Sequence, residues 1–146
     1  MMWGTAVLAL VLIVAPGCSE QPQSDFQSMD GEEIYRLHCQ VCHGSDGSGI
    51  SGQCPPFQGS TRLADEDRRH EILEIMLLGK VGEVERGEEL YRGVMPAWRN
   101  ELGNRQMADV LNYIRSRQWG VVGRPFEAAE VEEARVRAVG KAHFSN

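Results

Sequence analysis

The chain has 146 residues, enough for one domain with short extensions. A quarter of the residues are charged, the formal net charge is −6, and only two residues are lysines. Binding to nucleic acid needs a basic surface, so this balance excludes nucleic acid as the expected partner. It favours a partner that carries a basic patch.

The first segment, residues 1–17, is predicted to be an export signal. Its apolar run from Ala6 to Ala15 is shorter than the roughly 20 residues of a membrane-spanning helix. Pro16 and Gly17 then end any helix, and Cys18 follows directly. This arrangement resembles the lipobox of bacterial lipoproteins, which makes Cys18 the predicted lipidation site. A soluble exported protein and an uncleaved anchor are the alternatives, and all three place the domain on the periplasmic side of the cell membrane.

Residues 18–29 are polar and are predicted to be a flexible linker. The folded domain is expected to span residues 30–120. It begins with a helix predicted from about Asp30 to Val41.

The end of this helix carries the pattern CQVCH at residues 39–43. Zinc would require four close Cys or His ligands, usually as two pairs, and a thioredoxin-like motif would follow a strand. Thiols at positions i and i+3 lie on one helix face, where each can add to a haem vinyl group. The next residue, His43, can then bind the iron. The pattern therefore predicts one covalent haem c, attached through Cys39 and Cys42.

The iron needs a second axial ligand besides His43, and Met95 is the predicted one. Gly93 frees the backbone of its loop, and Pro96 holds Met95 extended, which presents the thioether outward. The other candidates fall in apolar helical patterns, on a solvated helix face, near the C-terminus or beside the first cysteine. They are Met76, Met107, His70, His143 and His38.

The middle of the domain alternates loop, helix and hairpin signals. Residues 45–59 are rich in Gly, Ser and Pro and are expected to form a loop along the haem. A helix is predicted from about Asp65 to Leu78, ended by Gly79. Residues 82–93 are predicted to form a β-hairpin that turns at Arg86-Gly87.

The last domain helix is expected from about Asn104 to Gln118, and residues 121–146 form an extension. Within it, Ala128 to Val139 is predicted to be an amphipathic helix with Glu133 and Arg137 one turn apart. We favour a solvated helix that packs on its own domain. The alternative is a docking arm for a partner subunit.

Over roughly Gly31 to Trp119 the chain resembles a class I cytochrome c. The stretches that carry the resemblance are GEEIYRLHCQVCHGSDGSG, PPFQGS, LLGKVGEVERGEELYRGVMPAW and ADVLNYIRSRQWG. Within that class the chain is similar to the small domains found beside quinohaemoprotein alcohol dehydrogenases, nitrite reductases and terminal oxidases. The resemblance implies an all-α fold of about three core helices and a short β-hairpin around the covalent haem, here with an extra C-terminal helix.

The resemblance also implies a helix crossing. Gly31 and Tyr35 resemble first-helix positions that cross the last helix. Val110 and Tyr113 resemble their partners there. Glycine is suited to this position because it lets two backbones approach closely.

Around the proximal histidine, the carbonyl of Pro55 resembles the family's acceptor for the Nδ1–H of His43, with Pro56 as the alternative. Cys54 departs from the pattern expected before the two prolines. We interpret it as a small buried apolar residue, and a bond to an unlipidated Cys18 is the less favoured reading.

A haem iron held by His43 and Met95 has no open position for a substrate, so we expect single-electron transfer and not an enzyme. The expected partners are a redox protein donor and acceptor in membrane complexes, and the membrane is reached through a lipid anchor or a signal-anchor. The first alternative is a fixed electron-transfer subunit of a respiratory or dehydrogenase complex. The second is a labile Met95 that lets the iron bind a gas or peroxide.

Overall fold

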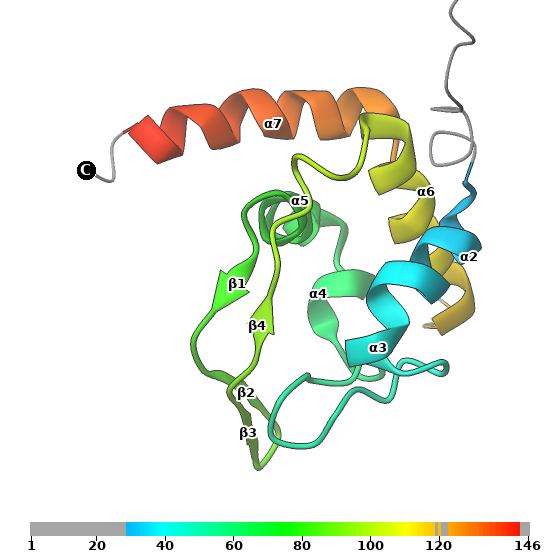
Figure 1. The fold of residues 1–146 in the computed structure, drawn as a ribbon, viewed down its shortest axis with the longest axis vertical. Helices are drawn as coiled ribbons and strands as arrows, with labels where there is room; N and C mark the ends of the chain where they lie inside the picture. Colours follow the sequence, from blue (N-terminus) through cyan, green and yellow to red (C-terminus); the bar gives the residue numbers. More distant parts are fainter. Residues whose placement is uncertain (1–28, 119, 121–122, 144–146) are drawn as a thin grey trace, which may run out of the picture.

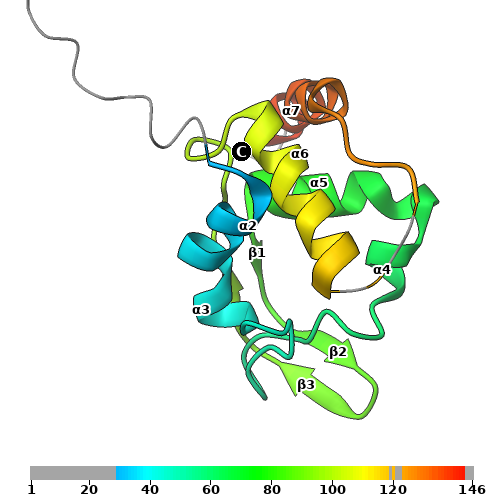
Figure 2. The same cartoon turned by 90° about the vertical axis from the view of Figure 1, so that its right-hand side faces the viewer.

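The computed structural model describes residues 29–118, 120 and 123–143. The predicted export signal, Cys18 and almost all of the predicted linker lie outside these residues. In Figures 1 and 2 the C-terminal helix α7 lies across one end of the molecule, and the strands β2 and β3 form the opposite end. Within the described part of the chain, no helix combines the length and the apolarity needed to cross a membrane.

The first helix is continuous but contains a π-helical turn. Its parts are α2 (Gly31–Ile34), the π-helical turn (Tyr35–Cys39) and α3 (Gln40–His43). Asp30 caps the start, since its carboxylate accepts a hydrogen bond of 2.9 Å from the backbone N–H of Glu33. The helix extends two residues beyond the predicted end at Val41, so Cys42 and His43 belong to its last turn.

The other helical segments follow a long loop. They are α4 (Thr61–Ala64), a 3₁₀ turn (Glu66–Arg68), α5 (Arg69–Leu78), α6 (Asn104–Tyr113), a second π-helical turn (Ile114–Gln118) and α7 (Ala128–His143). Gly79 ends α5 with a φ of 74°, as predicted. The predicted second helix is split, because its first turn is 3₁₀, and α4 was not predicted.

The first and last domain helices cross at Gly31. A β-carbon built there would lie 2.2 Å from the backbone oxygen of Asp109 on α6. The rings of Tyr35 and Tyr113 pack with their centroids 5.4 Å apart, and Val110 is fully buried. This is the close crossing that the resemblance implies, and it needs glycine for steric reasons.

The strands form two small antiparallel sheets. β1 (Lys80–Val81) pairs with β4 (Val94–Met95), and β2 (Val84–Arg86) pairs with β3 (Glu89–Tyr91). Since Arg86 pairs with Glu89, the hairpin turns at Gly87-Glu88, and the predicted turn at Arg86-Gly87 is wrong by one residue. Gly87 has a φ of 62°, which suits a turn with glycine at its first central position.

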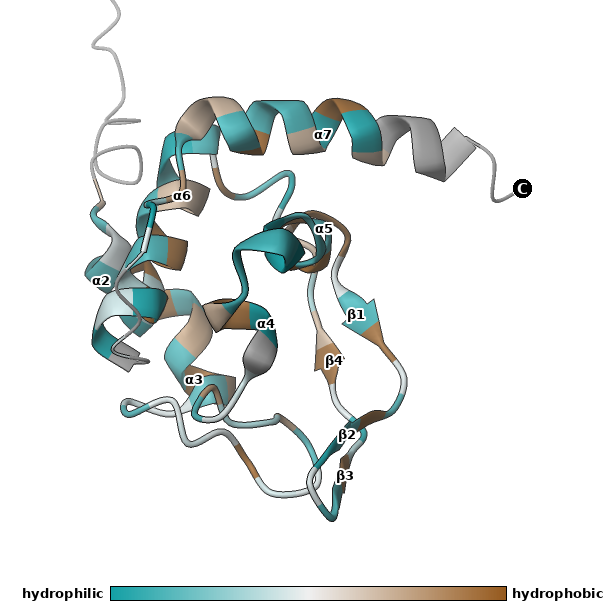
Figure 3. Ribbon diagram, turned by 180° about the vertical axis from the view of Figure 1, so that it is seen from behind, coloured by the Kyte–Doolittle hydropathy of each residue, from teal (hydrophilic) through white to brown (hydrophobic). Residues whose placement is uncertain are grey.

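Helix α7 packs on α5 and α6 of its own domain. Hydrophobic and hydrophilic bands alternate along it (Figure 3), and Val131, Ala134 and Ala138 are buried in the common core. It begins at Ala128, as predicted, and continues to His143, past the predicted end at Val139. These contacts favour packing on its own domain over a free docking arm.

A polar network fastens the start of α7. The guanidinium of Arg69, 4% exposed, donates two hydrogen bonds to Glu130 of α7, one to Glu66 and two to backbone carbonyls just before α7. Arg115 donates to Glu66 as well. Phe126 lies under the Arg69 guanidinium, 3.8 Å from it. Each buried charge is thus paired, as a buried arginine requires.

Candidate functional site

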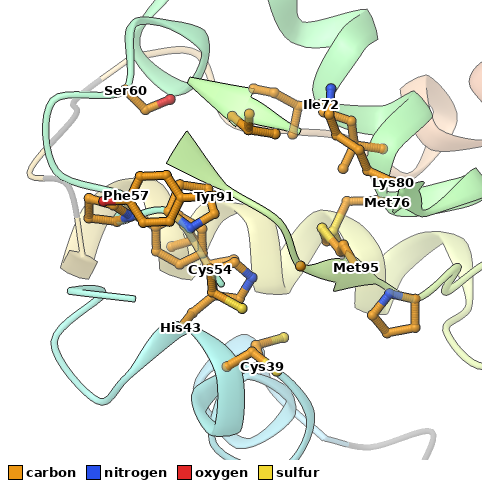
Figure 4. Close-up of a pocket in the computed structure, with 18 of the residues that line it drawn as sticks. Cys39, His43, Cys54, Phe57, Ser60, Ile72, Met76, Lys80, Tyr91 and Met95 are labelled. Atoms are coloured by element: carbon orange, nitrogen blue, oxygen red, sulfur yellow. The ribbon is translucent and has the colours of Figure 1, made fainter. Parts of the chain in front are cut away.

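A cavity of about 290 Å³ opens between the first helix, the loop after it, helix α5 and the four strands (Figure 4). All the residues that the sequence predicts to attach or ligate a haem line it, although they come from distant parts of the chain. They are Cys39, Cys42, His43, Pro55 and Met95. The fold therefore brings the predicted donor set together on the walls of one cavity.

His43 is the last residue of α3, and contacts are made both to its ring and to the backbone that follows it. It stacks on the ring of Phe57, with centroids 4.3 Å apart and an interplanar angle of 15°. The hydroxyl of Tyr35 donates a 2.6 Å hydrogen bond to the carbonyl of the next residue, Gly44. Burial lowers the pKa of His43 to about 4, so the imidazole is neutral at pH 7, as a metal ligand must be.

The predicted hydrogen bond from Nδ1 of His43 to the carbonyl of Pro55 can be compared with the structure. The Nδ1 atom is buried and has no hydrogen-bond partner among the described residues. The carbonyl of Pro56 accepts a 2.9 Å hydrogen bond from Arg86. Pro55 lines the cavity but does not accept from Nδ1 in this structure, so its role stays a prediction.

The two thiols of the CQVCH pattern face the same cavity. Cys39 is buried and Cys42 is half-buried, and neither forms a disulfide with another described cysteine. Burial raises the pKa of the Cys39 thiol to about 12, and the neighbouring Cys42 adds to the rise. In the described part of the chain, no three His, Cys, Asp or Glu side chains gather into a metal site.

Cys54 does not behave as a small residue of the hydrophobic core. It is half-buried, lines the cavity and pairs with Ile50 in an isolated β-bridge. Its pKa is raised, chiefly by burial and then by the thiol of Cys42 beside it. The interpretation as a buried apolar residue is therefore corrected. The possible partner Cys18 lies outside the described residues.

Met95 is held by backbone contacts on both sides of its short strand. Its partner across the sheet is Lys80 of β1. A β-carbon on Gly79 would lie 2.6 Å from the carbonyl oxygen of Met95, and one on Gly93 would lie 2.2 Å from the carbonyl oxygen of Gln53. The two glycines let the strand pass between the end of α5 and the loop that carries Cys54.

The other methionines and histidines separate into two groups. Met107 is fully buried among the helices, and His70 is exposed, as expected. Met76 is buried as predicted but also lines the cavity, beside Met95 in Figure 4. His38 lines the cavity too, where its ring packs on Trp98 with centroids 5.4 Å apart. The side chain of His143 lies outside the described residues.

Sequence reasoning missed the basic side chains of the cavity, which are Arg62, Lys80 and Arg86. A signal for Arg86 was available, because side chains two apart on a strand face the same side. Val84 and Arg86 therefore share a face of β2, and both line the cavity. The assignment of Arg86 to the turn concealed this alternation.

The donors present suit a haem. A neutral imidazole with its Nδ1 unsatisfied, a pair of thiols and a thioether surround a mostly apolar cavity, which matches covalent attachment and axial ligation of an iron porphyrin. The unsatisfied Nδ1 is the kind of buried polar atom that marks a functional position.

Comparison with known proteins shows the family of the chain. The family model described as Cytochrome c matches residues 28–118. Cytochrome c-552 of Thermus thermophilus is 36% identical over 115 residues, an alignment that covers 74% of this chain and 86% of the relative.

Subunits of larger dehydrogenases are similar as well. The cytochrome c subunit of alcohol dehydrogenase (quinone) from Gluconobacter oxydans is 29% identical over 94 residues, which is 64% of this chain and 19% of the subunit. The gluconate 2-dehydrogenase cytochrome c subunit of Pantoea cypripedii is 32% identical over 93 residues, covering 64% of this chain and 21% of the subunit.

Proposed function

The chain belongs to the cytochrome c family of electron-transfer proteins with covalent haem c, and on this premise we propose that it is a mono-haem electron carrier with His43 and Met95 as axial ligands. Cys39 and Cys42 would attach the haem through thioether bonds. The observation that carries this proposal is that all four side chains line one cavity, reached from the first helix and from β4.

The haem supplies one-electron exchange between Fe(II) and Fe(III), and the protein supplies the ligands and a dry surrounding. His43 is neutral and stacked on Phe57, so its imidazole would be available to hold the iron. Met95 enters from a strand that is paired to β1. With both axial positions taken, the iron has no position for a substrate, which distinguishes a carrier from a gas- or peroxide-binding protein.

We also propose that the protein is exported, is lipidated at Cys18 and transfers electrons on the periplasmic side of the membrane. Donor and acceptor are redox proteins, and the net charge of −6 favours partners with basic patches.

A fixed subunit of a dehydrogenase complex is the second candidate. Two of the relatives named above are cytochrome c subunits of dehydrogenases, which supports it. Copurification with larger subunits from native membranes separates this candidate from a shuttle.

Two thioethers line the cavity, so the ligand is tested with a matched pair of variants, Met95→Leu and Met76→Leu. In the periplasmically matured protein, Met95→Leu is expected to lower the reduction potential and to open the iron to added ligands, because a neutral thioether favours Fe(II). Met76→Leu is expected to leave both properties unchanged. The reverse pattern would make Met76 the ligand.

A further inference from the structure

Two guanidinium groups reach the cavity from different elements. Arg62 comes from α4 and Arg86 from β2, and both line the cavity. They are close enough to affect each other, because the pKa of Arg86 is lowered by burial and then by the positive charge of Arg62. Lys80 is a third cation in the lining of this mostly apolar cavity. Like charges gathered in this way are unfavourable unless an anion joins them.

Arg86 has no anionic partner of its own. It donates one hydrogen bond to a neutral acceptor, the carbonyl of Pro56, and it forms no ion pair with any carboxylate of the described residues. Its neighbour across the hairpin, Glu89, points elsewhere, since its carboxylate accepts from Ser51, from the backbone of Gly52 and from Tyr91. Arg86 therefore has guanidinium N–H groups at the cavity that can donate to a further acceptor.

Arg62 is only partly neutralised. Its Nε lies 3.3 Å from a carboxylate oxygen of Glu71 but makes no hydrogen bond among the described residues, although it is buried. Glu71 directs both of its oxygens to Arg68, at 2.9 and 2.8 Å. One carboxylate is thus shared by two guanidinium groups.

Arg69, which binds the start of α7, differs from Arg62 and Arg86 in its hydrogen bonding. Arg69 has five hydrogen bonds, two of them with Glu130, and none of its donors faces the cavity. Arg62 and Arg86, which line the cavity, therefore keep N–H donors without an acceptor, whereas the donors of Arg69 are all used.

We propose that Arg62 and Arg86 bind the propionate carboxylates of the haem, so that α4 and the hairpin β2–β3 hold the edge of the porphyrin opposite its thioethers. Vinyl and propionate groups occupy opposite edges of a porphyrin. In Figure 4, Ser60, two residues before Arg62, lies across the cavity from Cys39. Guanidinium forks match carboxylates in geometry as well as in charge.

A consequence follows for the protonation of the haem. Two neighbouring cations keep a propionate ionised, so its proton does not compete with electron uptake near neutral pH. Besides the two thiols that would attach the haem, the other titratable groups of the cavity lining are His38 and His43 on the first helix, Cys54, Lys80 on β1 and Tyr91 on β3. Glu71 lies beside Arg62, and Glu89 accepts a hydrogen bond from Tyr91. Arg62→Gln also removes a contact of Glu71, whereas Arg86→Gln does not, so a carboxyl protonation that appears in both variants belongs to the propionate.

The test measures the reduction potential of the matured holoprotein from pH 5 to pH 9. Arg86→Gln and Arg62→Gln are compared with Arg86→Lys, which keeps the charge, and with Arg92→Gln. Arg92 is the matched control, because it follows the same hairpin but is exposed and paired with Glu83 at 2.7 Å. Infrared difference spectra between the two redox states monitor the protonated carboxyl band.

Both Gln variants at the cavity are expected to show a pH-dependent step that the wild type lacks, together with a new protonated-carboxyl band. Above that step their potential lies below that of the wild type, because a cation near the iron has been lost. Arg86→Lys removes most of the step, and Arg92→Gln matches the wild type. Superimposable pH profiles and infrared spectra for all the variants would overturn the proposal. It rests on the haem of the family and not on Met95, so its failure leaves the axial ligation untouched.

Discussion

The backbone of Met95 passes so close to Gly79 that a β-carbon on Gly79 would lie 2.6 Å from the Met95 carbonyl oxygen. The glycine that ends helix α5 therefore also makes room for the strand that carries the proposed ligand. Its φ of 74° excludes ordinary side chains for a second reason.

Gly79→Ala is expected to displace β4 and to weaken the bond between Met95 and the iron. Its matched control is Gly87→Ala in the hairpin turn, which also has a positive φ, of 62°, but has no atom within 4 Å of the added carbon. Backbone strain at a positive φ costs on the order of 1–3 kcal/mol in either variant. Only Gly79→Ala should also weaken the near-infrared charge-transfer band of the oxidised protein. Equal effects of both variants on this band would contradict the account.

Breaking the Arg69–Glu130 pair is expected to loosen α7. Glu130→Gln removes one of the two carboxylates that pair with the buried guanidinium and leaves Glu66 as the other, so we expect it to cost about 1.5–3 kcal/mol of unfolding free energy. Glu133→Gln is the control on the same helix. Its pair with Arg137 is largely exposed, so a loss of at most about 0.5 kcal/mol is expected. Denaturant unfolding measures both values.

The same pair predicts an acid-sensitive contribution to stability. The hydrogen bonds from Arg69 hold the pKa of the Glu130 carboxyl below its usual range, so the folded state binds its proton less readily than the unfolded state. The stabilisation is therefore present above the unfolded pKa of about 4.3 and is lost as the pH falls through the lower folded value. The melting temperature of the wild type should fall more steeply below pH 4.5 than the melting temperature of Glu130→Gln. Parallel curves would show that Glu130 does not make this contribution.

Haem attachment is expected to require Cys39 and Cys42 but not Cys54, although all three thiols line the cavity. Cys42→Ala should retain a single thioether, and Cys54→Ala should retain two. The absorption of the haem in alkaline pyridine distinguishes one thioether from two, and the haem mass on the denatured chain confirms attachment. A changed spectrum in Cys54→Ala would show that this thiol takes part in attachment.

Much of the fold could be predicted because the ends of its helices depend on residues close in sequence. Asp30 caps the first helix, Gly79 stops α5, and the bounds of the last domain helix agree with the apolar pattern. The hairpin turn was misplaced because either dipeptide around Gly87 supplies the glycine that a tight turn needs. The register with Glu89, which decides between them, depends on pairing that the pattern does not contain.

The proposed ligands were predictable for the same reason, since CQVCH and the Pro-stiffened Met95 are local patterns. The basic wall of the cavity was not, because Arg62 and Arg86 meet only when α4 and β2 pack around one space. The pairing of β1 with β4 was likewise missed, because strands of two residues have no periodicity of their own.

The central claim, one iron ligated by His43 and Met95, is tested most directly by the near-infrared spectrum of the resting oxidised protein. The account predicts a low-spin haem with the Met-to-Fe(III) charge-transfer band, present in the wild type and in Met76→Leu and absent from Met95→Leu. A wild-type spectrum without this band, or a high-spin resting haem with a vacant axial position, would contradict the account.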